Sequence, residues 1–468
     1  MLDRRKILKL SAAIPALFST SALGAWKLTS RRKRPNMIHI CTDDVRFDDD
    51  RYMPYLKHYL RNQGTNFTSS FVPFPFCAPA RICFLLGLHV HNTGIYKNKG
   101  DGGGYGAYAP LEGNSLPVWL SDAGYYVGHI GKFINDYDKV APDHIPPGYS
   151  DWHVMSSSFD DYFNFTLNEN GTQVAYNNGE YTTDVFIQKT LDFIANAPQP
   201  WALFLWPNCC HGPAVPAQQD QGSFANVPQP LPPSFNENDV SDKPTYIQNL
   251  PLLTDQQISD IQDRWRARQE TLQSLDRGIK TIFDALTQAG LIDNTHIMYT
   301  SDNGFLEGEH RVNDHKNLLY EESTRIPLYW YQPGGSKASC ASPTIMMDVT
   351  AAMVELAQAT PGRDLDGKSL LPLLAEPKGH GWNRAVLIAC DESTGIATQR
   401  YRYMQWGFHH KHEYELYDMT NDPYQLNNQI DNPAYVNIRE ACATALASLQ
   451  GCSGQSCSWT GHFPPPPK

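Results

Sequence analysis

Three short apolar segments, each ending in polar residues, constrain the fold of this chain more than any other feature. They are residues 37–41 (MIHIC), residues 201–208 (WALFLWPN) and residues 295–304 (THIMYTSDNG). Continuous apolar runs of this length are typical of strands buried on both faces of a sheet. Because helical patterns lie between them, the sequence predicts an α/β sheet covered by helices on both faces.

One long helix is predicted between about Asp255 and Gly290. Its apolar residues recur at helical spacing, and a glycine follows the last of them; they are Leu272, Leu275, Ile279, Ile282 and Leu286. The Pro- and Asn-rich residues 227–244 predict a surface loop.

The C-terminal part of the chain has a different pattern. Residues 385–390, 399–407 and 413–419 are typical of antiparallel strands. We therefore predict a main domain over residues 35–380 and a smaller α+β domain over residues 381–460, which carries an antiparallel sheet. The proline-rich residues 461–468 predict a disordered tail, and we find no internal repeats.

The net charge and the N-terminal sequence limit the class of binding partner and the cellular location of the protein. The 468 residues carry a formal net charge of -11, which argues against a nucleic-acid-binding protein but not against an anionic substrate. Residues 1–30 predict an export signal: the pair Arg4-Arg5 is typical of the twin-arginine type, and the apolar run after it is shorter than a spanning helix and contains Pro15. We expect an exported protein, periplasmic in a bacterium or secreted, with no stable membrane insertion.

Ten cysteines in a chain of this length do not predict a disulfide-dense scaffold. Cys442, Cys452 and Cys457 lie close together, so a short terminal disulfide is expected there, with its pairing left open. A second possible pair is Cys77 with Cys83.

The segment FCAPAR (residues 76–81) predicts an anion pocket that contains a sulfur atom. Proline favours the start of a helix, so we expect Cys77 just outside a helix that runs from Pro79 to about Leu86. A helix N-terminus attracts a tetrahedral oxyanion, and Arg81 in the first turn adds guanidinium donors. A thiol with a lowered pKa is one interpretation of Cys77.

An acidic pair, Asp43-Asp44, follows the first predicted strand, and the pair Asp302-Asn303 follows the segment at residue 295. The carboxyl ends of strands line the ligand crevice of open α/β sheets. Oxygen ligands of this kind predict a hard cation, Ca²⁺ or Mg²⁺, but the sequence after Asp43 lacks the glycine and glutamate of an EF-hand loop. A solvated acidic turn is the alternative for Asp43-Asp44 alone.

The pattern Cys77-x-Pro79-Ala80-Arg81, followed by Gly87 and by HNTG at residues 91–94, resembles the signature of the type I sulfatases. This resemblance implies an alkaline-phosphatase-like mixed sheet between helices. It also implies that a formylglycine-generating maturation enzyme converts Cys77 to formylglycine. The implied metal ligands, with calcium favoured over magnesium, are Asp43, Asp44, Cys77, Asp302 and Asn303.

Further segments extend the resemblance over residues 35–428. GKFIND, around Lys132, is similar to the N-acetylglucosamine-6-sulfatase and heparan endosulfatase branch, although Ile134 stands where many arylsulfatases have a histidine. Other implied sulfate or substrate contacts are His211, Lys316 and, more weakly, Asn135 and His310. We expect His315 to be a surface residue.

The implied reaction is hydrolysis of sulfate monoesters on a sulfated carbohydrate. The hydrated aldehyde attacks sulfur, and Asp302 holds the proton of the attacking hydroxyl. His211 donates a proton to the leaving alcohol, Lys132 and Lys316 hold sulfate oxygens, and Arg81 supports the nucleophile. Two alternatives stay open: a phosphonate or phosphate ester hydrolase of the same superfamily, and a non-catalytic binding protein for sulfated glycans if Cys77 is unmodified.

Overall fold

The computed structural model describes residues 34–379, 381–391, 393–407 and 412–465. The predicted export signal (residues 1–30) therefore lies outside the described residues, as do residues 466–468 of the predicted tail. Residues 461–465 form neither helix nor strand. Within the described ranges, no helix is both long and apolar enough to cross a membrane.

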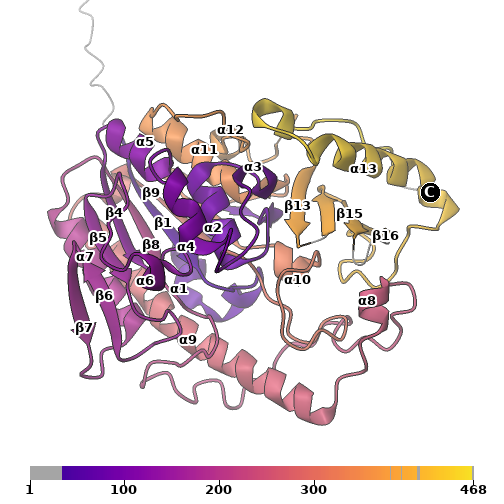
Figure 1. Ribbon diagram of the computed structural model, residues 1–468, viewed down its shortest axis with the longest axis horizontal. Coiled ribbons are helices and arrows are strands. Elements are labelled where there is room, and N and C mark those ends of the chain that lie inside the picture. Colours follow the sequence, from indigo (N-terminus) through magenta and orange to yellow (C-terminus); the bar gives the residue numbers. More distant parts are fainter. Residues whose placement is uncertain (1–33, 380, 392, 408–411, 466–468) are drawn as a thin grey trace, which may run out of the picture. The chain divides into compact units, whose positions relative to one another are not determined.

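A ten-stranded mixed sheet forms the centre of the fold (Figure 1). Its strands, in spatial order, are β11 (Ala338–Cys340), β2 (Thr65–Phe67), β10 (Leu328–Tyr331), β9 (Thr295–Ser301), β1 (Asn36–Thr42), β8 (Trp201–Trp206), β4 (Tyr126–Gly131), β5 (Asp151–Met155), β6 (Phe165–Glu169) and β7 (Thr172–Tyr176). The five central strands from β9 to β5 are parallel to one another, whereas β10, β6 and β7 run antiparallel to their neighbours.

Alternate residues of the central strands enter two separate cores. In β1, Met37 and Cys41 belong to one core, and Ile38 and Ile40 belong to the other. Helices α2 (Cys77–Leu86), α5 (Leu116–Asp122) and α11 (Met346–Ala357) pack in the first core, and α7 (Thr182–Asn196) and α9 (Asp255–Gln288) pack in the second. The prediction of an α/β sheet covered on both faces is confirmed.

Short elements fill the connections. They are α1 (Pro54–Leu56), α3 (Val90–Thr93), α4 (Gly104–Tyr108), α6 (Tyr137–Val140), α8 (Thr245–Gln248), α10 (Glu321–Thr324), α12 (Leu371–Ala375) and the two-stranded pair β3 (Ser70–Phe71) with β12 (Thr344–Ile345). Residues 227–244 form a loop without helix or strand, as predicted.

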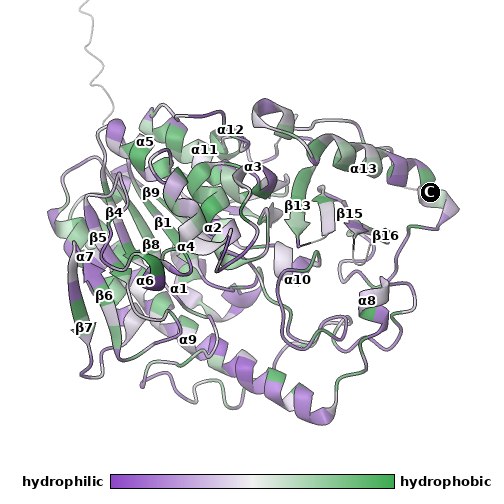
Figure 2. Ribbon diagram, in the orientation of Figure 1, coloured by the Kyte–Doolittle hydropathy of each residue, from purple (hydrophilic) through white to green (hydrophobic). Residues whose placement is uncertain are grey.

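Helix α9 matches the predicted helix closely. Thr254 caps its N-terminus and forms a capping box with Gln257, and Gly290 follows its end with a φ of +68°. The predicted apolar residues of this helix are buried. The first turns of α9, at the lower right of Figure 2, are mainly hydrophilic, and the helix enters the core only from about Ile261 onward.

The C-terminal part forms a second, four-stranded antiparallel sheet. Its strands are β13 (Val386–Cys390), β14 (Ser393–Ala397), β15 (Tyr401–Trp406) and β16 (Glu413–Asp418), and α13 (Val436–Leu449) packs against it. Three of these strands are the predicted ones, whereas β14 was not predicted. The domain boundary predicted near residue 380 falls between α12 and β13 and stays a prediction.

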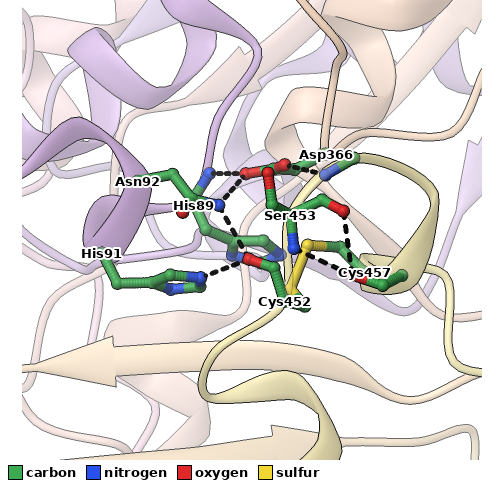
Figure 3. The surroundings of a disulfide bond; sticks show 9 residues. His89, His91, Asn92, Asp366, Cys452, Ser453 and Cys457 are labelled. Carbon is green, nitrogen blue, oxygen red and sulfur yellow. Dashed lines mark hydrogen bonds between the residues drawn. A yellow bond between two sulfur atoms is a disulfide. The ribbon is translucent and has the colours of Figure 1, made fainter.

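A disulfide closes a short loop after α13 (Figure 3). It joins Cys452 to Cys457, and Cys442 remains a free, buried thiol, which resolves the pairing left open above. The carboxylate of Asp366 accepts hydrogen bonds from Gly454 N at 2.7 Å and from Asn92 Nδ2 at 2.8 Å. The loop is thereby joined to α3, which follows α2 in the chain.

Asp348, in the first turn of α11, joins the main sheet's helices to the C-terminal sheet. Its carboxylate accepts hydrogen bonds from Ile345 N at 2.9 Å, from Lys368 N at 2.8 Å and from Arg384 Nη1 at 3.1 Å. Arg384 stands just before β13, and both side chains of this ion pair are buried. Removing one partner would leave the other charge buried and uncompensated.

Replacing Asp348 with alanine is therefore expected to lower the free energy of unfolding by about 3–5 kcal/mol. Urea unfolding followed by circular dichroism measures this change. The control is Asp314→Ala, because Asp314 is 48% exposed and its ion pair with Arg264 spans 3.6 Å; it should cost less than about 1 kcal/mol. Equal losses of unfolding free energy in the two variants would contradict a stabilising role for the buried ion pair of Asp348 with Arg384.

Candidate active site

The two residue pairs predicted to bind a metal, Asp43-Asp44 and Asp302-Asn303, meet at one edge of the central sheet. β1 and β9 are adjacent and parallel, so Asp43 and Asp44 at the end of β1 lie beside Asp302 and Asn303 at the end of β9. Asp44 N donates to Asp302 Oδ1 at 3.2 Å, with Asp44 in a left-handed conformation at a φ of 65°. All four side chains are buried.

Helix α2 brings Cys77 to this edge. The helix begins at Cys77, so the prediction that Cys77 lies just outside a helix starting at Pro79 was wrong by two residues. Pro79 is tolerated as the third helical residue because backbone N–H groups there have no partner inside the helix. Asn98 completes the start by accepting a hydrogen bond from Ala78 N at 2.8 Å. Cys77 and Cys83 are both free, so the alternative disulfide is also wrong.

The sulfur and carboxylate oxygens form one tight group. Single ligand atoms of Asp43, Asp44, Cys77 and Asp302 all lie within 4.8 Å of one another. Asn303 Oδ1 is buried and has no hydrogen-bond partner among the described residues. An oxygen-rich set with one unused amide oxygen fits a hard divalent cation, so the residues present agree with the predicted metal site.

Three cationic side chains neutralise the three carboxylates. Arg81, fully buried, places Nε 2.9 Å from Asp302 Oδ2 and Nη2 3.2 Å from Asp43 Oδ2. Lys132 Nζ is paired with Asp43, and Lys316 Nζ with Asp44. Lys316 Nζ also lies 2.9 Å from Cys77 Sγ. The formal charges of these six groups cancel, so a bound divalent cation would make the site positive.

The same surroundings set the protonation states. Burial alone would raise the pKa of Asp43, but Lys132, His211 and Arg81 outweigh it and hold the pKa far below its usual range. Burial, reinforced by Asp43, raises the pKa of Asp302. Burial also raises the pKa of the Cys77 thiol to about 12, despite the nearby lysines. An unmodified thiol would be neutral here, which contradicts the interpretation of Cys77 as a low-pKa nucleophile.

A glycine at the end of β4 fixes the position of Lys132. Gly131 has a φ of +109°, and a Cβ atom there would lie 2.2 Å from Trp206 O, so only glycine fits. Lys132 N then donates to Trp206 O at 2.7 Å. The ammonium group lies 3.9 Å from the centroid of the Phe159 ring.

His211 approaches the same group from the segment after β8. One of its ring nitrogens lies within 4.8 Å of ligand atoms of Asp43 and Cys77. Nδ1 is 2.7 Å from Gly212 O and 3.2 Å from a carboxylate oxygen of Asp160. A carbonyl oxygen only accepts hydrogen bonds, so Nδ1 carries a proton and Nε2 is the nitrogen left to exchange one.

The remaining residues named from the sequence are Asn135, His310 and His315, and they differ in burial and in hydrogen-bond partners. Asn135 is buried, and its Oδ1 has no partner in the described part of the chain. His310 is fully buried, with Nδ1 2.7 Å from Glu237 Oε2 and its ring stacked on Tyr320 at 4.2 Å. His315 is exposed, as expected. Contacts of Asn135 and His310 with a substrate stay predictions.

The sequence interpretation missed Asn98, Phe159 and Asp160. None of these residues belongs to a periodic pattern or stands beside a predicted strand end. Asp160 is half-exposed and in a loop, where an acidic residue is unremarkable by composition. Only its distance to His211 assigns it to the site.

Comparison with known proteins bears on the family of this chain. A family model described as Sulfatase matches residues 35–359, and one described as N-sulphoglucosamine sulphohydrolase, C-terminal, matches residues 308–451. A Caenorhabditis elegans protein named as an extracellular sulfatase Sulf-1 homologue is 31% identical over 79% of this chain, which spans 54% of that relative's length. The human N-acetylglucosamine-6-sulfatase is 27% identical, covering 97% of this chain and 91% of its own.

A solved structure, described as a complex with its substrate D-glucosamine-2-N,6-O-disulfate, has the same fold. Its TM-score is 0.75 at 23% sequence identity, and the match covers 89% of this chain and 98% of that chain.

The cation site predicts a stability change. Calcium at about 100 times its dissociation constant should raise the free energy of unfolding by about 2.7 kcal/mol relative to a chelator, because the ion binds the folded chain. Thermal unfolding with Ca²⁺, Mg²⁺ or EDTA measures it. Asn303→Ala should shrink the calcium effect, whereas Asn313→Ala, outside the group, should retain it. Identical melting curves of the parent protein in calcium and EDTA would refute the site.

Proposed function

The chain belongs to the sulfatase family, and from this membership we propose that it hydrolyses sulfate monoesters of a sulfated carbohydrate. The observation that carries the proposal is the placement of Cys77, at the start of α2, within one group of three carboxylates and three cations. Such a group suits a tetrahedral anion and a nucleophile at the same point.

The family implies a divalent cation and a formylglycine, and we propose Ca²⁺ as the cation because, with formylglycine at position 77, its protein ligands would all be oxygens. When bound, the cation supplies positive charge and Lewis acidity. The residues that would hold it are Asp43, Asp44, Asp302 and Asn303, with the side chain at position 77. Formylglycine at that position supplies an oxygen nucleophile where a neutral thiol would be inert.

Lys132 and Lys316 would bind the sulfate group. Each is now paired with one carboxylate, Asp43 or Asp44. With a cation held by these carboxylates, the ammonium groups of Lys132 and Lys316 would be free to bind the oxygens of an anion instead. Arg81 remains fixed by two carboxylates, and its guanidinium group holds Asp43 and Asp302 in place.

His211 would protonate the leaving alcohol. Its Nδ1 proton is held by Gly212 O, with Asp160 nearby, so Nε2 is the nitrogen available to the ester oxygen. Asp160 lies 3.2 Å from Nδ1, and Phe159 packs edge-on against the imidazole with ring centroids 5.3 Å apart. A protonated, oriented imidazole is the required state of a general acid.

For the substrate we propose a 6-O-sulfated amino sugar in a glycosaminoglycan or related polysaccharide. The support is the likeness to the human N-acetylglucosamine-6-sulfatase over almost the whole chain. We further propose that the protein is exported and that a formylglycine-generating enzyme matures it. A panel of defined sulfated saccharides tests the sugar and the sulfate position.

Replacing Cys77 with alanine is expected to abolish hydrolysis of p-nitrophenyl sulfate, by at least about 10⁴-fold in kcat/KM, because no nucleophile remains. The parent protein, produced with a formylglycine-generating enzyme, should turn over the sulfate ester faster than p-nitrophenyl phosphate or a phosphonate ester. Mass spectrometry of the peptide holding residue 77 should show oxygen in place of sulfur. Preference for the phosphate or phosphonate ester would favour the alternative hydrolase, and an unmodified, inactive Cys77 would favour the binding protein.

Replacing His211 with glutamine is expected to lower kcat by about 10²–10⁴-fold on a sulfated sugar. The loss should be much smaller on p-nitrophenyl sulfate, because nitrophenolate is a good leaving group that needs little protonation. His315→Gln is the matched control and should leave both rates nearly unchanged. Equal losses on the two substrates would contradict a general-acid role.

A further inference from the structure

Arg268 breaks the apolar pattern of α9. The large apolar residues that α9 buries between Ile261 and Ile279 recur at intervals of three and four, and Arg268 occupies one position of this series. The series is Ile261, Trp265, Arg268, Leu272, Leu275 and Ile279. Uncharged polar residues of the helix, such as Gln269, Thr271 and Ser274, are buried as well. Arg268 is only 4% exposed. A charged group at such a position requires several buried partners.

Those partners come from three separate segments that carry the candidate active site. Arg268 Nη2 donates to the backbone oxygen of Asp44 at 2.6 Å, and Nη1 donates to that of Cys210 at 3.4 Å. Nε lies 3.0 Å from Glu307 Oε1 in an ion pair. The guanidinium carbon lies 4.7 Å from the centroid of the Phe305 ring. One side chain thus contacts the segments that follow β1, β8 and β9.

Two of these segments are also joined directly. Asp43 N donates to Cys209 O at 3.0 Å, and Cys210 N donates to Asp43 O at 2.9 Å. Arg268 adds a hydrogen bond to Asp44, the residue after Asp43, and a further hydrogen bond to Cys210. The carbonyl of Cys210 immediately precedes His211, and the carbonyl of Asp44 belongs to a predicted metal ligand.

The hydrogen-bond acceptors around Arg268 favour an arginine over a lysine. A guanidinium presents five donors in one plane and reaches several acceptors at once, whereas an ammonium group is a point charge. Glu307 is buried and is also 3.5 Å from Arg46, so it retains one cationic partner if Arg268 is replaced. The two carbonyl contacts have no such substitute.

We propose that Arg268 is a positioning residue that holds Asp44 and His211 in a fixed relation to the segment after β9. Its effect on turnover rests on the proposed function, but its effect on the backbone and on cation binding does not. Replacing a group that binds and orients a metal ligand in this way typically changes metal affinity or activity by about 10–100-fold.

The test compares Arg268→Gln with Arg268→Lys, Glu307→Gln and Arg277→Gln. Arg277 is the matched control: it lies on the same helix and binds Asp220 through two contacts of 2.7 Å, away from the three segments. Hydrogen exchange read by mass spectrometry follows residues 43–49, 207–212 and 302–309 against the core strand β4. Calcium titration followed by thermal unfolding gives the cation affinity, and kcat and KM are measured at saturating calcium.

In Arg268→Gln we expect faster exchange in the three segments but not in β4, and calcium affinity lower by about 10–100-fold. At saturating calcium, kcat should fall more than KM rises. Arg268→Lys should recover part of each effect, and Glu307→Gln and Arg277→Gln should stay close to the parent protein.

Uniformly faster exchange that includes β4, or unchanged exchange with parental calcium affinity, would reduce Arg268 to a structural residue and overturn the proposal. Equal losses in Arg268→Gln and Glu307→Gln would assign the effect to the ion pair and overturn the role of the carbonyl contacts. A parent protein that cleaves no sulfate ester would refute the proposed function alone, because the exchange comparison needs neither substrate nor cation.

Discussion

Mutual repulsion among three buried carboxylates is the constraint on which the rest of this structure depends. Asp43, Asp44 and Asp302 meet because β1 and β9 are parallel neighbours, and none of them is exposed by more than 2%. Such a group folds only if positive charge enters with it. Arg81, whose guanidinium carbon lies 5.1 Å from the centroid of the Trp206 ring, supplies one positive charge, and Lys132 and Lys316 supply the other two. The balance of three against three explains why cations converge here from α2, from the end of β4 and from the segment before α10.

Rigid elements carry most of this arrangement. The carboxylates stand at strand ends, residue 77 stands in the first turn of a helix, and Lys132 follows a glycine whose geometry admits no other residue. Sites built on such elements lose little conformational entropy when a substrate binds, because their side chains are already ordered. The exception is His211 with Asp160, which are 21% and 50% exposed. A group that must exchange a proton with a leaving alcohol needs contact with the solvent side of the site, and this pair has it.

Patterns in short stretches of sequence predicted the central strands, the long helix and the carboxylates of the site. The apolar runs at β1, β8 and β9 gave the central strands, helical spacing gave α9 to within two residues, and residues after the strands gave the carboxylates. Contacts between distant segments left no such pattern, so Asn98 and Asp160 were missed. The start of α2 was misplaced because Asn98, which caps it, comes from another segment. The spacing of the three C-terminal cysteines did not encode the pairing of Cys452 with Cys457, nor the hydrogen bond from Gly454 N in that loop to Asp366 of a distant segment.

The complete burial of Cys77 constrains when the proposed conversion to formylglycine can take place. Its side chain has no exposed surface in the finished fold, with α2 packed on the sheet and Lys316 lying over the sulfur. No second protein can reach an atom enclosed in this way. Any enzyme that remodels this sulfur must therefore capture the polypeptide while the segment around residue 77 is still extended. Under the proposed conversion to formylglycine, a chain that folds first would keep its thiol, and the yield of converted protein would depend on the relative rates of conversion and folding.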